Sequence, residues 1–330
     1  MNILITGGGG FLGQAIVCQC LAAGFRIHTF SRKFYDSLNG NGIEQFAGDL
    51  SNYEALIKAM YGCDAVIHVA AKTGIQGTYR EFFETNVTGT KNILNACNEL
   101  QIRYLVYTSS ASVVYSGDSE GKNEDLLYPE KFDAFYPKTK AIAEKMILDA
   151  NDHTLVTVAL RPHLIWGPED PHFMPRLLEK RRKNKLWLLG RKKYLVDITY
   201  IDNAAKAHLQ VLNKMIDEPK SLGGKPYFIS QDEPISVQEF IDRLLYCGGL
   251  DPVDKRINPI VARFAGWTIQ TFYRVFKLKK EPPFDLFIAK QLSSSHWYDI
   301  SAAKRSFNYF PEVSTDEGMK RLKRFLCSFS

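Results

Sequence analysis

The sequence lacks the features that mark disulfide-stapled, metal-binding and membrane-spanning proteins. Its six cysteines form no Cys-x-x-Cys pair, and no histidine stands at metal-ligand spacing from them. We therefore expect no metal site, and reduced, mostly buried thiols in a reducing compartment. No apolar run approaches the length that spans a bilayer. Internal repeats and low-complexity linkers are also missing, which excludes solenoid and fibrous architectures.

Charge of one sign is not concentrated strongly either. The formal net charge is only +6 over 330 residues, so we expect no nucleic-acid partner. The densest basic stretch, residues 176–193, is interpreted as a solvated helix face, with a surface for anionic lipid or an acidic ligand as the alternative. A strand begins directly after Met1 with no basic leader before it. We therefore expect a cytoplasmic protein, with membrane association as the alternative.

Short apolar runs alternate with helical patterns through the first half of the chain. The predicted strands are 3–5, 25–30, 45–47, 65–69, 104–108 and 155–160, and the predicted helices include 11–23, 79–100 and 134–149. Because these strands are apolar on both faces, helices should cover both sides of their sheet. The predicted fold class is α/β, a Rossmann-type doubly wound parallel sheet with a smaller C-terminal α/β lobe.

The second half is less regular than the first. We predict a strand at 196–200, a helix at 204–214, and a helix through Leu245 that begins at the N-cap Ser236 with Glu239 completing a capping box. The proposed division is a larger domain at 1–165 and a smaller lobe at 166–330, some segments of which return to the larger domain.

The stretch 260–276 combines apolar and aromatic residues with a narrow polar stripe. At about 100° per residue, Arg263, Gln270, Arg274 and Lys277 fall on one side. One interpretation is a core helix with one wet edge. The alternatives are a helix in peripheral contact with a membrane through 260–280, or the wall of an entry to an apolar substrate pocket.

A glycine-rich turn follows the first predicted strand and opens the first predicted helix. Gly7, Gly10 and Gly13 show the spacing Gly-x-x-Gly-x-x-Gly, which permits a tight turn and a close approach of backbone to phosphate. The free N–H groups at the helix start would face a pyrophosphate. This position in a βαβ unit predicts a dinucleotide site.

The end of the second predicted strand discriminates between the two nicotinamide dinucleotides. A carboxylate there would favour NAD, but the sequence has Ser31, Arg32 and Lys33. A guanidinium suits a 2′-phosphate, so NADP(H) is the preferred cofactor and NAD(H) the alternative. Asp49, after the third strand, could accept a hydrogen bond from adenine, and the small Ala70 and Ala71 would let the cofactor lie close to the sheet.

A phenol and an ammonium lie one helical turn apart in Tyr136-Pro-Lys-Thr-Lys140. A cation beside a phenol lowers the pKa of the phenol, so the pair can exchange a proton with a carbonyl or alcohol oxygen. Ser110, after the fifth predicted strand, can donate a hydrogen bond to the same oxygen, with Ser109 as the competing candidate. These residues predict interconversion of a ketone and a secondary alcohol.

Several segments together resemble the extended short-chain dehydrogenases, a group of the NAD-dependent epimerase/dehydratase superfamily. They are residues 6–13, 69–71, 86–90, 108–110, 136–140, 160–162 and 297–311. Residues 70–75, 112–115, 135–144 and 159–168 are most similar to the 3β-hydroxysteroid dehydrogenase branch, and within it to bacterial 2-alkyl-3-oxoalkanoate reductases of olefin biosynthesis.

The resemblance implies catalysis by Tyr136 and Lys140, with Lys140 also holding the nicotinamide ribose, Pro162 touching the nicotinamide, and Asn86 near the cleft. The complete predicted cofactor site is Gly7, Gly10, Phe11, Leu12, Gly13, Ser31, Arg32, Lys33, Asp49, Leu50, Ala70, Ala71, Lys72, Asn86, Thr108, Tyr136, Lys140 and Pro162.

The predicted function is NADP-dependent reduction of a lipid-like 2-alkyl-3-oxoalkanoate to the 3-hydroxy acid. A 3β-hydroxysteroid or sterol dehydrogenase and a nucleotide-sugar epimerase or dehydratase are the alternatives. The resemblance also suggests a homodimer through the helices at 79–100 and 134–149. Four further side chains keep open roles: His163 and His172 as structural residues or extra acids, and Arg161 or Lys72 as partners of a substrate carboxylate.

Overall fold

A computed structural model describes residues 1–171, 173–276, 284 and 286–328. Its centre is a seven-stranded parallel sheet in the order β3-β2-β1-β4-β5-β7-β12. The strands are β1 (Asn2–Thr6), β2 (Arg26–Ser31), β3 (Ile43–Ala47), β4 (Ala65–His68), β5 (Tyr104–Thr108), β7 (Val156–Pro162) and β12 (Lys225–Ile229). This is the doubly wound order expected for a Rossmann-type fold.

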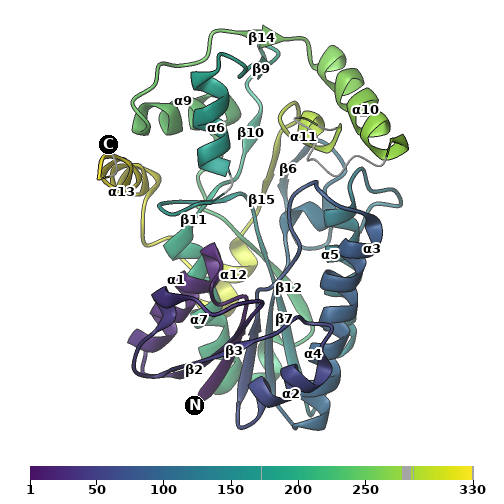
Figure 1. Ribbon diagram of the computed structural model, residues 1–330, viewed down its shortest axis with the longest axis vertical. Coiled ribbons are helices and arrows are strands. Elements are labelled where there is room, and N and C mark those ends of the chain that lie inside the picture. The colour runs from purple at the N-terminus through teal and green to yellow at the C-terminus, as the bar shows by residue number, and fades with distance from the viewer. Residues whose placement is uncertain (172, 277–283, 285, 329–330) are drawn as a thin grey trace.

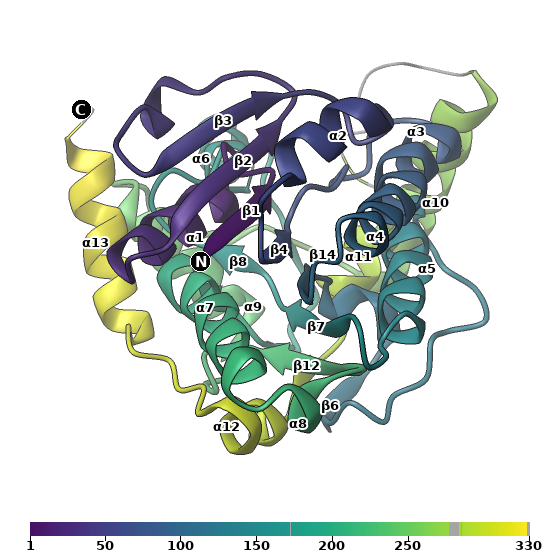
Figure 2. The same cartoon turned by 90° about the horizontal axis from the view of Figure 1, so that it is seen from below.

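Helices cover both faces of this sheet, as the apolar strands predicted (Figure 2). The side chains of Ile3 and Ile5 enter the core under α1 (Phe11–Ala22) and α7 (Ile201–Asp217), whereas Leu4 enters the core on the opposite face. All three side chains are fully buried. The opposite face is covered by α2 (Tyr53–Met60), α4 (Gly89–Glu99) and α5 (Phe135–Asp149), and α3 (Tyr79–Phe83) packs on α5.

The second lobe stands beyond the carboxyl ends of the main strands (Figure 1). A four-stranded sheet has the order β13-β10-β15-β6, and two strand pairs, β8 with β11 and β9 with β14, accompany it. The strands are β6 (Ser119–Lys122), β8 (Ile165–Trp166), β9 (Leu188–Leu189), β10 (Leu195–Val196), β11 (Thr199–Tyr200), β13 (Ile235–Ser236), β14 (Arg256–Ile257) and β15 (His296–Tyr298). The remaining helices are α6 (Phe173–Arg182), α8 (Pro219–Leu222), α9 (Val237–Cys247), α10 (Pro259–Val275), α11 (Leu286–Gln291), α12 (Ser301–Phe307) and α13 (Thr315–Cys327).

Segments from the second half return to the first domain. Helix α7 packs on α1, and β12 extends the main sheet beside β7. The boundary at residue 165 stays a prediction, since the chain crosses between the two parts several times.

Three local predictions need correction. The single strand predicted at 196–200 is divided between β10 and β11, which belong to different sheets. The helix predicted at 79–100 contains a π-helical turn, η2 (Glu84–Thr88), between α3 and α4. At Ser236 the hydroxyl accepts a hydrogen bond from the Glu239 N–H, which is one half of the expected capping box.

The core interpretation of the 260–276 stretch is wrong. In α10 the polar side chains Arg263 and Gln270 point toward the protein, and aromatic residues such as Phe264 and Trp267 are exposed. Lys277 and the side chain of Arg274 lie outside the described part of the structure. No helix among the described residues is both long and apolar enough to cross a membrane.

Candidate functional site

The glycine turn after β1 has the geometry that a dinucleotide phosphate needs. Gly7 has φ of +70°, and a Cβ there would come 3.0 Å from the Ala70 backbone. A Cβ on Gly13 would come 2.0 Å from the Gly7 carbonyl oxygen. Helix α1 begins at the N-cap Gly10, which offers no side-chain cap. The first-turn N–H groups, those of Phe11, Leu12 and Gly13, therefore remain available for an anion.

A buried hydrogen-bond chain holds this turn against the end of β4. The Thr6 hydroxyl oxygen accepts from the N–H groups of Val69 and Ala70, both at 3.1 Å, and contacts His68 Nδ1 at 2.7 Å. Because burial lowers the pKa of His68 to about 3, its ring is neutral. Thr6 therefore donates to Nδ1, and Nε2–H donates to Thr90 at 3.0 Å.

Asn86 lies in the π-turn η2 and connects the loop after β4 to α5. Its side chain accepts from the Lys72 N–H at 2.7 Å and donates to the Lys72 carbonyl and the Thr139 hydroxyl, both at 3.0 Å. Because these bonds all go to the protein, Asn86 acts here by positioning the loop and the residue before Lys140. π-turns of this kind are frequent at functional sites.

The loop after β2 brings its basic residues to the open edge of the glycine turn. Arg32 and Lys33 are exposed, and the Ser31 hydroxyl lies 3.4 Å from the Gly9 N–H as its acceptor. The sequence reasoning missed Tyr35. The Tyr35 ring covers Gly9 so closely that a Cβ on Gly9 would fall 2.1 Å from it.

Gln45 on β3 fixes this same loop. Its side chain accepts from the Tyr35 N–H at 2.9 Å and donates to the Tyr35 carbonyl at 3.0 Å. No sequence signal marked it, because a glutamine in a strand near the sheet edge is ordinary. The two bonds make the loop that carries Arg32 and Lys33 a well-defined surface beside the glycine turn.

The other predicted cofactor positions lie around the same edge with different exposures. Asp49 is exposed, and its Oδ1 accepts from the Ser51 N–H and hydroxyl. Leu50 is buried against Gly89 of α4. Ala70, Ala71 and Lys72 are half-buried at the end of β4, and Pro162 is buried at the end of β7.

Tyr136 and Ser110 meet at the carboxyl edge of the sheet. Tyr136 lies in the first turn of α5 with a half-buried side chain, and the Ser110 hydroxyl, which contacts the Ser112 hydroxyl at 2.8 Å, is near enough to lower the pKa of the phenol. Burial raises the pKa of Tyr136, opposite to the lowering expected from a neighbouring cation, and the interaction with Ser110 offsets part of this rise. The competing Ser109 is 3% exposed, and its hydroxyl has no partner among the described residues. The geometry therefore favours Ser110 as the hydroxyl that shares a substrate oxygen with Tyr136.

Lys140 is buried one helical turn beyond Tyr136. Its ammonium donates to the Thr108 carbonyl at 2.5 Å and lies 4.1 Å from the centre of the Tyr107 ring. Burial lowers the pKa of Lys140 to about 7, although nearby Glu144 opposes this shift. The Thr108 hydroxyl contacts His208 Nε2 at 2.8 Å, so Thr108 contributes its backbone carbonyl to this site.

Arg161 and Glu144 form a buried ion pair beneath the catalytic candidates. The guanidinium donates to the carboxylate through Nε, at 3.0 and 3.1 Å, and through Nη2 at 2.6 Å. The Tyr128 hydroxyl donates to the same carboxylate at 2.7 Å. Arg161 is therefore occupied by Glu144, which leaves Lys72 as the more accessible of the two cations considered for a substrate carboxylate. The Lys72 ammonium lies 3.4 Å from Glu81.

His163 is buried between the two parts of the molecule. Its Nδ1 contacts the Asp197 carbonyl at 2.8 Å, and its Nε2 contacts His296 at 2.9 Å. Burial lowers the pKa of His163 to about 3. These contacts describe a neutral structural residue that joins β7 to the second lobe. His172 lies outside the described residues.

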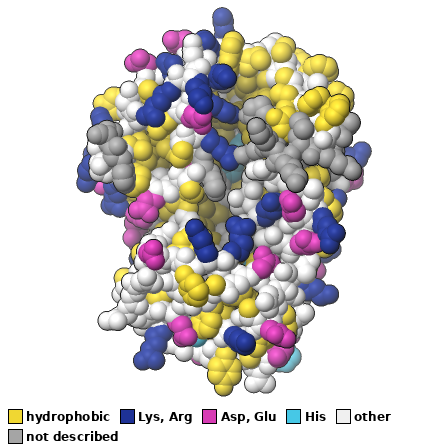
Figure 3. All heavy atoms as spheres, in the orientation of Figure 1, with side chains coloured by type: hydrophobic (Ala, Val, Ile, Leu, Met, Phe, Trp, Pro, Cys, Tyr) yellow, Lys and Arg dark blue, Asp and Glu magenta, His cyan; other side chains and the backbone are white. Residues whose placement is uncertain are grey.

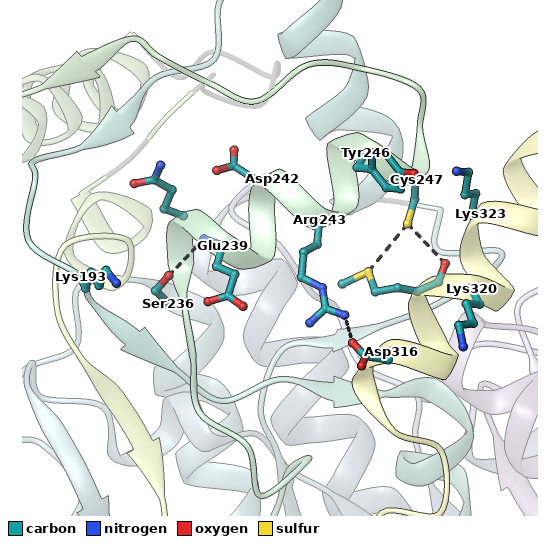
Figure 4. A pocket seen from close by; sticks show the side chains of 12 residues that line it. Lys193, Ser236, Glu239, Asp242, Arg243, Tyr246, Cys247, Asp316, Lys320 and Lys323 are labelled. Atoms are coloured by element: carbon teal, nitrogen blue, oxygen red, sulfur yellow. Dashed lines mark hydrogen bonds and ion pairs between the residues drawn. The ribbon is translucent and has the colours of Figure 1, made fainter.

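A groove in the second lobe lies away from this chemistry. It has a volume of about 750 Å³ and lies between α9 and α13, where Arg243 pairs with Asp316 and the Cys247 thiol donates to the Met319 carbonyl (Figure 4). None of Ser110, Tyr136 and Lys140 lines it. The candidate catalytic site is thus identified by converging side chains at the sheet edge, not by an enclosed volume.

Comparison with known proteins agrees with this geometry. The model of the 3-beta hydroxysteroid dehydrogenase/isomerase family matches residues 4–257. A 2-alkyl-3-oxoalkanoate reductase of Shewanella oneidensis is 47% identical over 98% of this chain and 86% of its own length. A decarboxylating sterol-4-alpha-carboxylate 3-dehydrogenase of Mus musculus is 32% identical over 96% of this chain and 88% of its own length.

Solved structures share the fold at low sequence identity. The UDP-glucuronic acid 4-epimerase of Bacillus cereus in complex with NAD has a TM-score of 0.75 and 21% identity, and the match covers 100% of this chain and 99% of the epimerase. The matched family model spans most of the chain, including the glycine turn, Ser110, Tyr136 and Lys140. The chain therefore belongs to the 3-beta hydroxysteroid dehydrogenase/isomerase family.

Proposed function

We propose that this protein uses NADPH to reduce the ketone of a 2-alkyl-3-oxoalkanoate to the 3-hydroxy acid. The observation that carries the proposal is the placement of Ser110 beside Tyr136, with Lys140 one helical turn further along α5, at the sheet edge that also holds the glycine turn. The substrate class is supported by the Shewanella oneidensis reductase, which matches nearly the whole chain.

The residues divide the work of the reaction between them. A bound nicotinamide supplies the hydride that the ketone carbon accepts. Tyr136 would donate its phenolic proton to the ketone oxygen, and Ser110 would donate a hydrogen bond to that oxygen while negative charge builds there. Lys140 would hold the nicotinamide ribose and stabilise the phenolate left on Tyr136 by its positive charge.

The glycine turn and the loop after β2 would hold the other half of the cofactor. The N–H groups of the first turn of α1 would bind the pyrophosphate, and Arg32 with Lys33 would bind a 2′-phosphate. Both side chains are exposed beside the turn. This supports NADP(H) as the preferred cofactor, with NAD(H) as the weaker one.

The Arg32→Ala protein should lose affinity for NADPH and keep its affinity for NADH. One charge-assisted contact to phosphate corresponds to a rise of about 10- to 100-fold in the KM for NADPH. Steady-state kinetics with both cofactors measures this difference. Equal changes in the two KM values would show that Arg32 contacts a part common to both cofactors, such as adenine.

The two adjacent serines should respond differently to alanine. Removing one hydrogen-bond donor to a developing oxyanion typically costs about 100-fold in kcat, and we expect a loss of this order for Ser110→Ala. Ser109→Ala is the matched control, since its hydroxyl is buried and has no hydrogen-bond partner among the described residues. A larger loss of kcat in Ser109→Ala than in Ser110→Ala would reverse the assignment.

A sterol dehydrogenase is the second candidate, favoured by the 32% identity with the Mus musculus enzyme over most of both chains. NADPH consumption with a 2-alkyl-3-oxo acid, a 3-ketosteroid and a UDP-sugar distinguishes the substrate classes. Activity on the oxo acid alone is expected. Activity on the steroid alone would move the assignment to the sterol reaction.

The resemblance also supports a homodimer through the helices at 79–100 and 134–149. Analytical ultracentrifugation should give twice the mass of one chain. A monomer at micromolar concentration would contradict this part of the proposal.

A further inference from the structure

Helix α10 carries its apolar residues on the outside of the protein. Six large apolar side chains between 260 and 276 are 51% to 76% exposed, while Ala262 on the opposite side is buried. The exposed residues are Ile260, Val261, Phe264, Trp267, Phe272 and Phe276. At 100° per residue they cover about half of the helix circumference. We call this surface the α10 apolar face.

Hydrogen bonds on the inner side fix this orientation. Arg263 donates through Nε to the Ser293 hydroxyl and through Nη2 to the Ser293 carbonyl, both at 2.9 Å. Gln270 donates to the Asp133 carbonyl at 3.1 Å. Rotating the helix to bury its aromatic residues would break these bonds and expose Ala262. These contacts therefore hold the α10 apolar face outward.

One polar group on this face is satisfied within the helix. The Thr268 hydroxyl lies between the aromatic residues and donates to the Phe264 carbonyl at 2.9 Å. It consequently offers its hydrogen to the helix and not to a polar partner. A contiguous exposed apolar surface rimmed by polar residues is typical of an interaction site.

Basic residues adjoin the first turn of α10. Strand β14 leads into the helix and pairs with β9, and exposed Trp187 before β9 lies 5.6 Å from the Lys255 ammonium. Figure 3 shows the apolar side chains gathered over α10, with lysines and arginines beside them. The exposed basic residues of these segments are Lys185, Arg191, Lys192, Lys193, Lys255 and Arg256.

We propose that the α10 apolar face docks on an anionic lipid bilayer, with these cations at the head groups. An amphipathic helix with Phe and Trp on one face suits the boundary between head groups and acyl chains, and flanking lysines and arginines add attraction to anionic lipid. A second copy of the chain would bring the same positive charge to the contact, so charge complementarity favours the bilayer.

The role of this docking rests on the proposed function, because it would bring the protein to a substrate with long alkyl chains. Gln270 and Lys290 both bind Asp133, three residues before Tyr136. The helix is thus anchored to the segment that leads into the catalytic turn of α5. A substrate with two long alkyl chains would reside in the bilayer, and docking would bring the catalytic edge of the sheet close to it.

Vesicle flotation of the full-length protein tests the proposal without any assay of turnover. The probes are vesicles of phosphatidylcholine and phosphatidylglycerol at three to one, and vesicles of phosphatidylcholine alone. We expect flotation with the anionic vesicles, weakened by salt and by the absence of phosphatidylglycerol. The double variant Phe264→Gln/Trp267→Gln should bind at least about tenfold more weakly.

Tyr61→Gln is the matched control, because Tyr61 is 74% exposed at the end of α2 in the other half of the molecule. It should float like the unmodified protein. Absence of flotation in the unmodified protein, or equal flotation of the double variant, would overturn the proposal. So would a dimer that dissociates in the double variant, since the face would then be covered by a second copy. Turnover of a short-chain oxo acid should be unchanged in the double variant, so loss of docking and failure of the proposed reaction are separable.

Discussion

The Tyr136→Phe protein is expected to lose about a thousandfold in kcat for reduction of the oxo acid. The phenylalanine keeps the ring and removes only the hydroxyl, whose pKa the neighbouring Ser110 lowers. Hydride transfer would then leave an alkoxide with no proton donor beside it. The KM for NADPH should change little, because the glycine turn and Arg32 are untouched.

The size of the effect has a reason in the structure. Burial raises the pKa of Tyr136, so the phenol is protonated at neutral pH and ready to act as an acid. The conjugate phenolate then needs stabilisation by Lys140, which is buried nearby. Tyr53→Phe is the matched control, since the Tyr53 hydroxyl bonds to Glu99 on α4. Full turnover in Tyr136→Phe would exclude this residue as the proton donor.

The Glu144→Gln protein should lose about 3 to 5 kcal/mol of unfolding free energy. Glu144 is fully buried and Arg161 is 3% exposed, so water cannot replace the lost carboxylate. The guanidinium would remain charged in the core with only an amide to face. The free energy of unfolding is measured by denaturant titration at pH 7, followed by circular dichroism.

An exposed pair on the same face of the sheet provides the control. Arg80 and Glu84 form an i,i+4 contact at 2.6 Å, and both side chains are at least half exposed. Water and salt screen such a pair, so Glu84→Gln should leave the unfolding midpoint nearly unchanged. If Glu144→Gln also left the unfolding midpoint nearly unchanged, the buried ion pair would not contribute the expected free energy of unfolding.

The architecture of the main sheet could be predicted because its strands are apolar on both faces. Ile3, Leu4 and Ile5 are each fully buried, which is what a strand covered by helices on both sides requires. The glycine spacing and the pair of Tyr136 and Lys140 could also be recognised in the sequence, since each motif joins positions close together in the chain. The sequence suggested that the cysteines are mostly buried. Four of the six lie in the interior, and all six are free thiols.

The predictions that failed concern contacts between segments that lie far apart in the chain. The polar stripe of α10 could be recognised in the sequence. Whether the stripe faces water or protein depends on its contacts with Ser293 and Asp133, which lie far away in the chain. The sequence left Arg161 open as the partner of a substrate carboxylate, because its actual partner, Glu144, lies 17 positions earlier in the chain. A signal did exist, since Glu144 follows Lys140 by one turn on the buried side of α5, and a buried carboxylate requires a cation.

Transfer of a label from the cofactor to the product is the most direct test of the proposed reduction. The protein would be given a 2-alkyl-3-oxo acid and NADPH deuterated at the transferable position of the nicotinamide, and the product would be identified by mass spectrometry. The proposed reduction should give a 3-hydroxy acid with one deuterium at C3, formed by the unmodified protein and not by Tyr136→Phe. Recovery of the oxo acid unchanged, or a 3-hydroxy acid without deuterium, would contradict it.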